Sequence, residues 1–128
     1  MPASGCFDDK KLAELQAGSS QAALVYVWSP RMVYSVQQIS VAQRAATSLG
    51  LNFIAVHDAR IAPQEIAAAH PSINSAPLCA EKLLHQEALR HFPISFILTA
   101  QGIHRHPIIG AMPDTAWHSS IAQRLQKP

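Results

Sequence analysis

Ala22-Ala23-Leu24-Val25-Tyr26-Val27-Trp28 is a continuous apolar run, rich in β-branched and aromatic residues, and it decides the fold. Such a run is typical of a strand covered on both faces of a sheet, so we expect a central strand. Ser29-Pro30 interrupts it. From Ser35 the apolar spacing predicts a helix, with Ser35 as N-cap and Gly50 as the stop. The apolar positions that recur every three or four residues are Val36, Ile39, Ala42, Ala46 and Leu49.

A second strand-like run, Leu51 to His57, follows that helix after one glycine. A strand, a helix and a strand joined this tightly form a right-handed βαβ unit with two parallel strands. Further along, the pattern predicts a strand over Ile94 to Ala100, a turn at Gln101-Gly102 and a second hairpin strand over His104 to Ile109. Pro107 fits only an edge strand, because it cannot donate to a ladder.

Helices are predicted at both ends of the chain. Asp8-Asp9 suits a helix N-terminus, and the expected helix covers 8–17. Pro113-Asp114 opens a last helix, whose apolar face should cover the sheet. In the less regular middle we expect a helical turn over 63–70, a loop over 71–77 and a helix over 80–90.

Composition limits the function classes. With 128 residues and 48% hydrophobic content, we expect one domain over 1–128 with its core in 22–126. A net charge of +2 with 14% charged residues does not favour a nucleic-acid partner. No apolar stretch approaches the ~20 residues of a membrane span, and the start lacks a signal-peptide pattern. We therefore expect a soluble protein, cytoplasmic as the sequence stands and periplasmic if a signal segment has been removed.

Two cysteines, Cys6 and Cys79, are too few for a disulfide framework. Cys6 falls in a predicted mobile terminus and Cys79 in a predicted loop. The pattern leaves open whether they are free, paired or reactive.

The predicted order is βαβ, connecting helix, β-hairpin and closing helix. Within it, four segments lie at characteristic spacings: Leu24 to Trp28, Phe92-Pro93-Ile94-Ser95-Phe96-Ile97-Leu98, Gln101-Gly102 and Gly110-Ala111. On these residues the chain resembles the thioredoxin superfamily. The resemblance covers roughly 22–126, apart from an insertion near 61–80. It implies an α/β fold of three layers, α/β/α, with a central mixed sheet of about four strands and flanking helices.

The reactive dithiol of that superfamily is missing here. Thioredoxins carry Cys-x-x-Cys four residues after the tryptophan, where this chain has Met32-Val33-Tyr34-Ser35. A thioether cannot attack a disulfide to form a mixed disulfide, and a hydroxyl cannot close one. Tyr26 also replaces the buried aspartate that catalytic thioredoxins carry two residues before Trp28. The resemblance therefore predicts a site without dithiol chemistry and without catalytic residues at 32 and 35.

The resemblance further implies a cis peptide bond before Pro93 and a preceding residue, Phe92, whose backbone pairs with an extended partner. One interpretation is that Phe92-Pro93 only packs the loop against Met32 and Tyr34. The other is that Trp28, Met32, Tyr34 and Phe92 line an apolar groove that accepts a peptide edge by β-augmentation. We favour a redox-inactive binding or assembly module that contacts a protein or peptide partner there.

Other features support different functions. Arg31 precedes a helix N-terminus and suggests an anion site. Cys79, with Cys6, suggests an atypical thiol–disulfide oxidoreductase. A third hypothesis is copper or haem handling through Met32 and histidines such as His104 and His106. The spacing of Cys79, His85 and His91 does not converge on one ion. We therefore expect no metal site and no cofactor.

Overall fold

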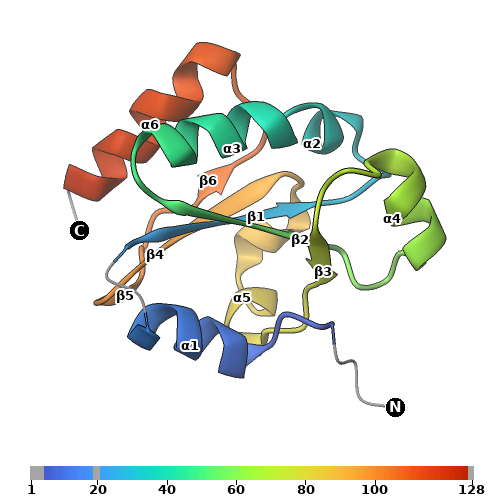
Figure 1. The fold of residues 1–128 in the computed structure, drawn as a ribbon, viewed down its shortest axis with the longest axis horizontal. Helices are drawn as coiled ribbons and strands as arrows, with labels where there is room; N and C mark the ends of the chain where they lie inside the picture. Colours follow the sequence, from blue (N-terminus) through green and yellow to red (C-terminus); the bar gives the residue numbers. More distant parts are fainter. Residues whose placement is uncertain (1–4, 19–20, 127–128) are drawn as a thin grey trace.

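The computed structural model describes residues 5–18 and 21–126, and its centre is a mixed sheet of six strands (Figure 1). The strands are β1 (Ala23–Trp28), β2 (Asn52–His57), β3 (Ser75–Pro77), β4 (Ile94–Thr99), β5 (Gly102–Ile103) and β6 (Ile108–Ile109). Their order is β3-β2-β1-β4-β5, and β6 pairs with β4. The predicted mixed sheet is confirmed, with more strands than the four expected.

β1 is the central strand that its sequence predicts. All six of its residues are buried. It runs parallel to β2, so that Trp28 lies opposite His57, and antiparallel to β4, so that Val27 lies opposite Ile94. β3 runs parallel to β2, with Pro77 opposite His57. The carboxyl ends of β1, β2 and β3 and the amino end of β4 therefore lie at the same end of the strands. We call this end of the sheet the site edge.

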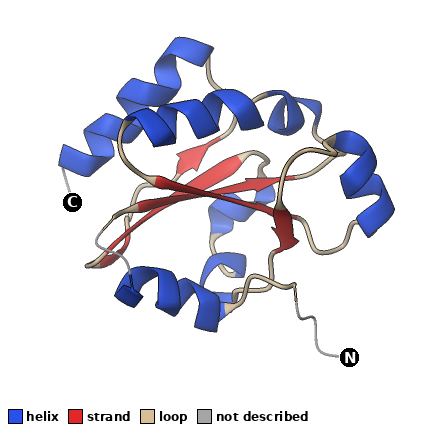
Figure 2. Ribbon diagram, in the orientation of Figure 1, coloured by secondary structure: helices blue, strands red, loops and turns tan. Residues whose placement is uncertain are grey.

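Helices cover both faces of the sheet. They are α1 (Asp9–Gly18), α2 (Val33–Gln37), α3 (Ile39–Ser48), α4 (Pro63–Ala69), α5 (Glu81–Leu84) and α6 (Asp114–Gln126), with a 3-10 turn over Glu87–Arg90. Figure 2 shows α3 and α6 on one face and α1 and α5 on the other. This is the three-layer arrangement expected from the sequence.

Alternate side chains of β1 pack into two separate hydrophobic cores, because successive side chains of a strand point to opposite faces of the sheet. Tyr26 and Trp28 pack with Trp117 of α6 in the core under α3 and α6. Val25 and Val27 pack with Leu12 of α1 in the core under α1 and α5. A strand that serves both cores must be apolar on both sides, which explains its continuous apolar run.

The helix predicted to begin at Ser35 begins earlier and is divided in two. Met32 is the N-cap of α2, and Ser35 is buried inside the helix. The division falls at Gln38, whose backbone angles are φ −95° and ψ 1°. The Gln38 side chain accepts hydrogen bonds from the Met112 N–H at 3.1 Å and from Trp117 Nε1 at 2.9 Å. This contact across to α6 could not be read from the local pattern.

Two other segments differ from the sequence prediction. The insertion near 61–80 contains α4 and β3, and β3 extends the sheet beside β2, which accounts for one added strand. Of the strand predicted over 104–109, only β6 at its end forms. β5 precedes the predicted strand, and β5 and β6 pair with different parts of β4. The helix predicted over 80–90 is only α5 and the 3-10 turn.

Candidate functional site

Residues 32–35 follow the turn after β1 and include the start of α2, so they lie at the site edge. Met32 is 47% exposed, Val33 57% and Tyr34 65%. Three consecutive large apolar side chains thus face solvent at the position where the resemblance places the dithiol. Exposed apolar groups that cluster in this way are typical of a contact surface.

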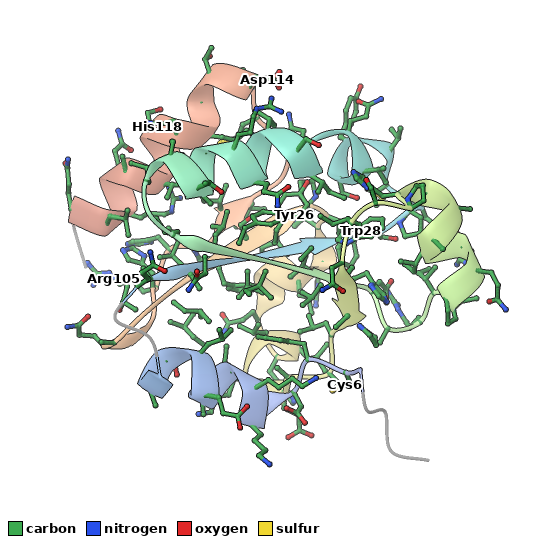
Figure 3. The ribbon with its side chains drawn as sticks, in the orientation of Figure 1. Cys6, Tyr26, Trp28, Arg105, Asp114 and His118 are labelled. Carbon is green, nitrogen blue, oxygen red and sulfur yellow. A yellow bond between two sulfur atoms is a disulfide. The ribbon has the colours of Figure 1, made fainter. Side chains whose placement is uncertain are left out.

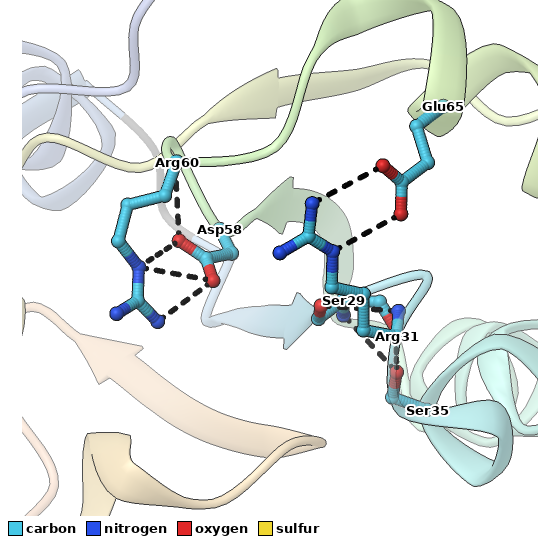
Figure 4. Close-up of polar contacts among 6 residues, drawn as sticks. All are labelled: Ser29, Arg31, Ser35, Asp58, Arg60 and Glu65. Atoms are coloured by element: carbon cyan, nitrogen blue, oxygen red, sulfur yellow. Dashed lines mark hydrogen bonds and ion pairs between the residues drawn. The ribbon is translucent and has the colours of Figure 1, made fainter.

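Ser35 ties the end of β1 to α2. Its hydroxyl accepts a hydrogen bond from the Ser29 N–H at 3.0 Å. The same oxygen lies 2.7 Å from the Ser29 carbonyl and 2.6 Å from the Met32 carbonyl, either of which can accept its proton. Figure 4 shows Ser29 and Ser35 joined in this way. Where the resemblance places the second cysteine of the dithiol, the chain therefore has a buried hydroxyl that holds the turn together.

Tyr26 of β1 also hydrogen-bonds to Ser35. Its hydroxyl donates to the Ser35 carbonyl at 2.6 Å, and its ring packs against Phe53 and Trp117 at 5.8 Å each. Burial raises the pKa of Tyr26 well above its ordinary value, so the phenol stays protonated and neutral. A neutral hydrogen-bond donor therefore stands where the resemblance expects a proton-accepting carboxylate.

Trp28 does not line a groove, contrary to the sequence prediction. The side chain is fully buried, and its Nε1 donates to Ser75 Oγ at 3.0 Å. His57 Nδ1 lies 2.7 Å from the same oxygen. Burial lowers the pKa of His57, and the nearby Asp58 charge opposes that shift in part. Ser75 thus joins β1, β2 and β3, and we remove Trp28 from the candidate contact surface.

Arg31 is engaged by a carboxylate rather than poised for an anion. Its guanidinium donates from Nε to Glu65 of α4 at 3.2 Å and from Nη2 at 3.4 Å. Nearby, Arg60 donates to Asp58 at 2.8 to 3.2 Å, and these hydrogen bonds lower the pKa of Asp58. Figure 4 shows both pairs beside the end of β1. The structure therefore gives the predicted anion site no support.

The Phe92–Pro93 peptide bond is cis, and it lies at the start of β4 on the site edge. The Pro93 carbonyl accepts from the Gly110 N–H at 2.8 Å. Among the described residues, neither the N–H nor the carbonyl of Phe92 makes a hydrogen bond. Phe92 is half-buried. Its backbone groups are thus open to an added strand.

A groove of about 680 Å³ opens at the same edge. Its apolar lining consists of Val27, Ala59, Leu78, Leu84, Leu89 and Phe92. The remaining lining residues are Asp58, Arg60, Cys79, His85, Gln86 and Arg90. Except for Phe92 and Cys79, the sequence analysis missed these residues. Several of these residues directly follow β2 or β3. Binding sites are often found at the carboxyl ends of parallel strands, so the predicted strand ends could have pointed to them.

Cys6 and Cys79 form a disulfide, with their Cα atoms 6.0 Å apart. The segment around Cys6 is held against the chain after β3: the Phe7 N–H donates to the Pro77 carbonyl at 2.8 Å, and the Cys79 N–H donates to the Phe7 carbonyl at 2.9 Å. Cys6 is 6% exposed and is labelled in Figure 3. The segment predicted as a mobile terminus is therefore an ordered, buried attachment to the sheet.

The predicted histidine pair lies in the turn between β5 and β6 rather than on a strand. The His104 and His106 rings are 5.7 Å apart, and the His106 N–H donates to His104 Nδ1 at 3.0 Å. No group of three His, Cys, Asp or Glu side chains that could hold a metal ion is found among the described residues. Nor does any helix in 5–18 and 21–126 have the length and apolar character needed to cross a membrane.

Several solved structures are similar to this chain in fold. A secreted disulfide oxidoreductase of Mycobacterium tuberculosis, homologous to E. coli DsbE, superposes with a TM-score of 0.59 at 11% identity, over 82% of this chain and 83% of that one. The exposed lipoprotein thioredoxin Etrx1 of Streptococcus pneumoniae gives 0.59 at 14% identity, over 85% and 86%. A thioredoxin-family thiol:disulfide interchange protein of Chlorobium tepidum gives 0.57 at 17% identity, over 88% and 83%.

These likenesses show that the chain has a thioredoxin-like fold. No family model and no curated protein sequence matches it. With no cysteine at 32 or 35, its single disulfide in the described residues joins Cys6 to Cys79. The site edge thus combines an exposed apolar turn, an open backbone segment and a disulfide at an unusual place.

Proposed function

We propose that this protein is a thioredoxin-fold binding module that takes an extended segment of a protein partner at the site edge, without dithiol chemistry at residues 32–35. The observation that carries the proposal is the exposure of Met32, Val33 and Tyr34. Complete burial of a fully exposed apolar side chain contributes about 1.5–3 kcal/mol, and about half of that is available from each of these partly exposed side chains.

The open backbone of Phe92 supplies the second part of the proposed contact. An extended segment that pairs with its N–H and carbonyl would lie along the start of β4, as in β-augmentation. Met32 and Tyr34 would then offer side-chain contacts from α2. Backbone pairing provides affinity with little sequence preference, whereas the apolar side chains select the partner.

The experiment compares partner capture by the wild type with capture by Met32→Asp and Phe92→Asp. We expect each charge to weaken binding of a co-purifying partner by at least about tenfold, because a charge in an apolar contact must be desolvated. Ala13→Asp is the matched control, since Ala13 is exposed on α1, on the opposite side of the sheet from α3. Binding that survives both site charges, with all variants folded, would refute the proposal.

The Cys6–Cys79 disulfide favours a second candidate function, thiol–disulfide exchange. Two of the similar structures are described as a disulfide oxidoreductase and a thiol:disulfide interchange protein. An insulin-reduction assay with the wild type and Cys79→Ser tests this candidate. Activity that disappears in the variant would support exchange, and an inactive wild type would reject exchange in the reducing direction. No observation favours the metal-handling hypothesis, and we do not propose it.

A further inference from the structure

We propose that the groove at the site edge seats a cysteine-containing extended peptide segment, and that its thiol exchanges with the Cys6–Cys79 disulfide by attack on Cys79. The inference rests on the second candidate function and adds its substrate class and its direction. It is independent of the contact proposed for Met32 and Tyr34.

Access differs between the two sulfur-bearing residues. Cys79 is half-buried and lines the groove, whereas Cys6 is 6% exposed and does not line it. Exchange needs a thiolate to reach one sulfur of the disulfide. The groove therefore makes Cys79 the attacked residue and Cys6 the leaving group.

The lining indicates what kind of segment enters. Leu84 on the groove wall is 43% exposed, which leaves an apolar surface for a side chain of the substrate. Arg60 is already paired with Asp58, whereas Arg90 forms no ion pair with another described side chain. Among the side chains that the structure describes, Arg90 is thus the groove's guanidinium without a carboxylate partner. The groove should prefer a cysteine with an apolar and an acidic neighbour, since an arginine pairs strongly with a carboxylate.

The reaction balances without a further reagent. A substrate thiolate attacks Sγ of Cys79, a mixed disulfide forms, the Cys6–Cys79 bond breaks, and the electron pair leaves on Sγ of Cys6. A second substrate thiolate then attacks the substrate sulfur of the mixed disulfide and displaces Cys79. Two substrate thiols are thereby oxidised to a disulfide, and the protein disulfide is reduced to two thiols. The two protons lost by the substrate are taken up by Cys6 and Cys79.

Cys6 stays close after its bond breaks. The backbone hydrogen bonds of Phe7 and its buried ring hold the segment independently of the sulfur. Cys6 can therefore reverse the first step, so a mixed disulfide with wild type will be short-lived. A variant that lacks Cys6 is needed to trap it.

The experiment follows Cys6→Ser and Cys79→Ser with a short synthetic peptide whose cysteine, flanked by leucine and glutamate, carries a thionitrobenzoate leaving group. Cys6→Ser should release the chromophore at least about tenfold faster than Cys79→Ser, because only Cys79 lines the groove. Equal rates, with both variants folded by circular dichroism, would overturn the assignment of Cys79.

Substrate choice is tested on the wild-type disulfide with the free peptide thiol. The leucine–glutamate peptide should reduce it about tenfold faster than glutathione and faster than the same peptide with lysine in place of glutamate. Leu84→Asp should lower that rate, and Ala13→Asp should not. If all thiols reduce the disulfide at the same rate, the groove does not bind the substrate, although thiol–disulfide exchange itself would still be supported. A disulfide that no thiol reduces would reject exchange, and neither result bears on Met32→Asp binding.

Discussion

Among single residues, two hydroxyl groups stabilise the turn and helix start where the resemblance places a dithiol. Ser35 receives the Ser29 N–H, and Tyr26 donates to the Ser35 carbonyl. Both residues are fully buried. A buried N–H without an acceptor is destabilising, because it loses its hydrogen bonds to water. The Ser35 hydroxyl is therefore needed to satisfy the Ser29 N–H in the turn after β1.

Removing the Ser35 hydroxyl tests this role. Ser35→Ala should lower the free energy of unfolding by about 1–3 kcal/mol, since the Ser29 N–H loses its side-chain acceptor in a buried place. Urea unfolding followed by circular dichroism measures the change. Ser119→Ala on the exposed face of α6 is the control and should stay within about 0.5 kcal/mol. A similar small loss in both variants would contradict the role of Ser35.

His57 predicts a pH dependence of stability. Its pKa is lowered in the folded protein by burial, against an ordinary value of about 6.5 in the unfolded chain. As pH falls below about 6.5, the unfolded chain binds a proton before the folded one does, so the free energy of unfolding decreases. Urea unfolding between about pH 7.5 and pH 5 should show this decrease, and His57→Gln should flatten it. An unchanged slope in His57→Gln would exclude His57 as its source.

At the scale of elements, α1 is fastened by a single well-buried side chain and by the segment before it. Leu12 is 1% exposed and packs with Val25 and Val27 of β1. The Lys82 N–H of α5 donates to Asp9 at 3.1 Å. The helix predicted over 8–17 is thus confirmed within one residue at each end, and its amphipathic leucines explain why.

Truncating Leu12 tests how α1 is held. Leu12→Ala should lower the free energy of unfolding by about 2–5 kcal/mol, because it removes apolar contacts and leaves a cavity. Urea unfolding measures the loss. Lys10→Ala, on the exposed side of the same helix, should have little effect. If Leu12→Ala were as mild as Lys10→Ala, α1 would not be part of the core.

At the scale of the whole molecule, one covalent link joins the start of the chain to the far edge of the sheet. Cys6 and Cys79 are 73 residues apart, and the link encloses α1, β1, α2, α3, β2, α4 and β3. Figure 1 shows α1 and the chain after β3 on the same side of the sheet. The disulfide therefore restricts the unfolded chain over more than half its length.

Breaking this link should cost stability whether or not it exchanges. For a closed loop of this size the chain-entropy relation gives about 4 kcal/mol. We expect Cys6→Ser/Cys79→Ser to lower the free energy of unfolding by up to this amount, measured by urea unfolding. A reductant should lower the stability of wild type similarly and leave the double variant unchanged. Equal stability of the two proteins without reductant would show that the link restricts nothing.

The amino-acid sequence alone predicted the central strand, the helix over 8–17, the last helix opened by Pro113-Asp114, and the absence of thiols at 32 and 35. Each of these depends on local periodicity or on residue identity. Three features could be learned only from the folded chain: the burial of Trp28, the bond between Cys6 and Cys79, and the groove beside Cys79. These depend on β3 adding to the sheet beside β2, and no local pattern encodes a pairing between segments so far apart.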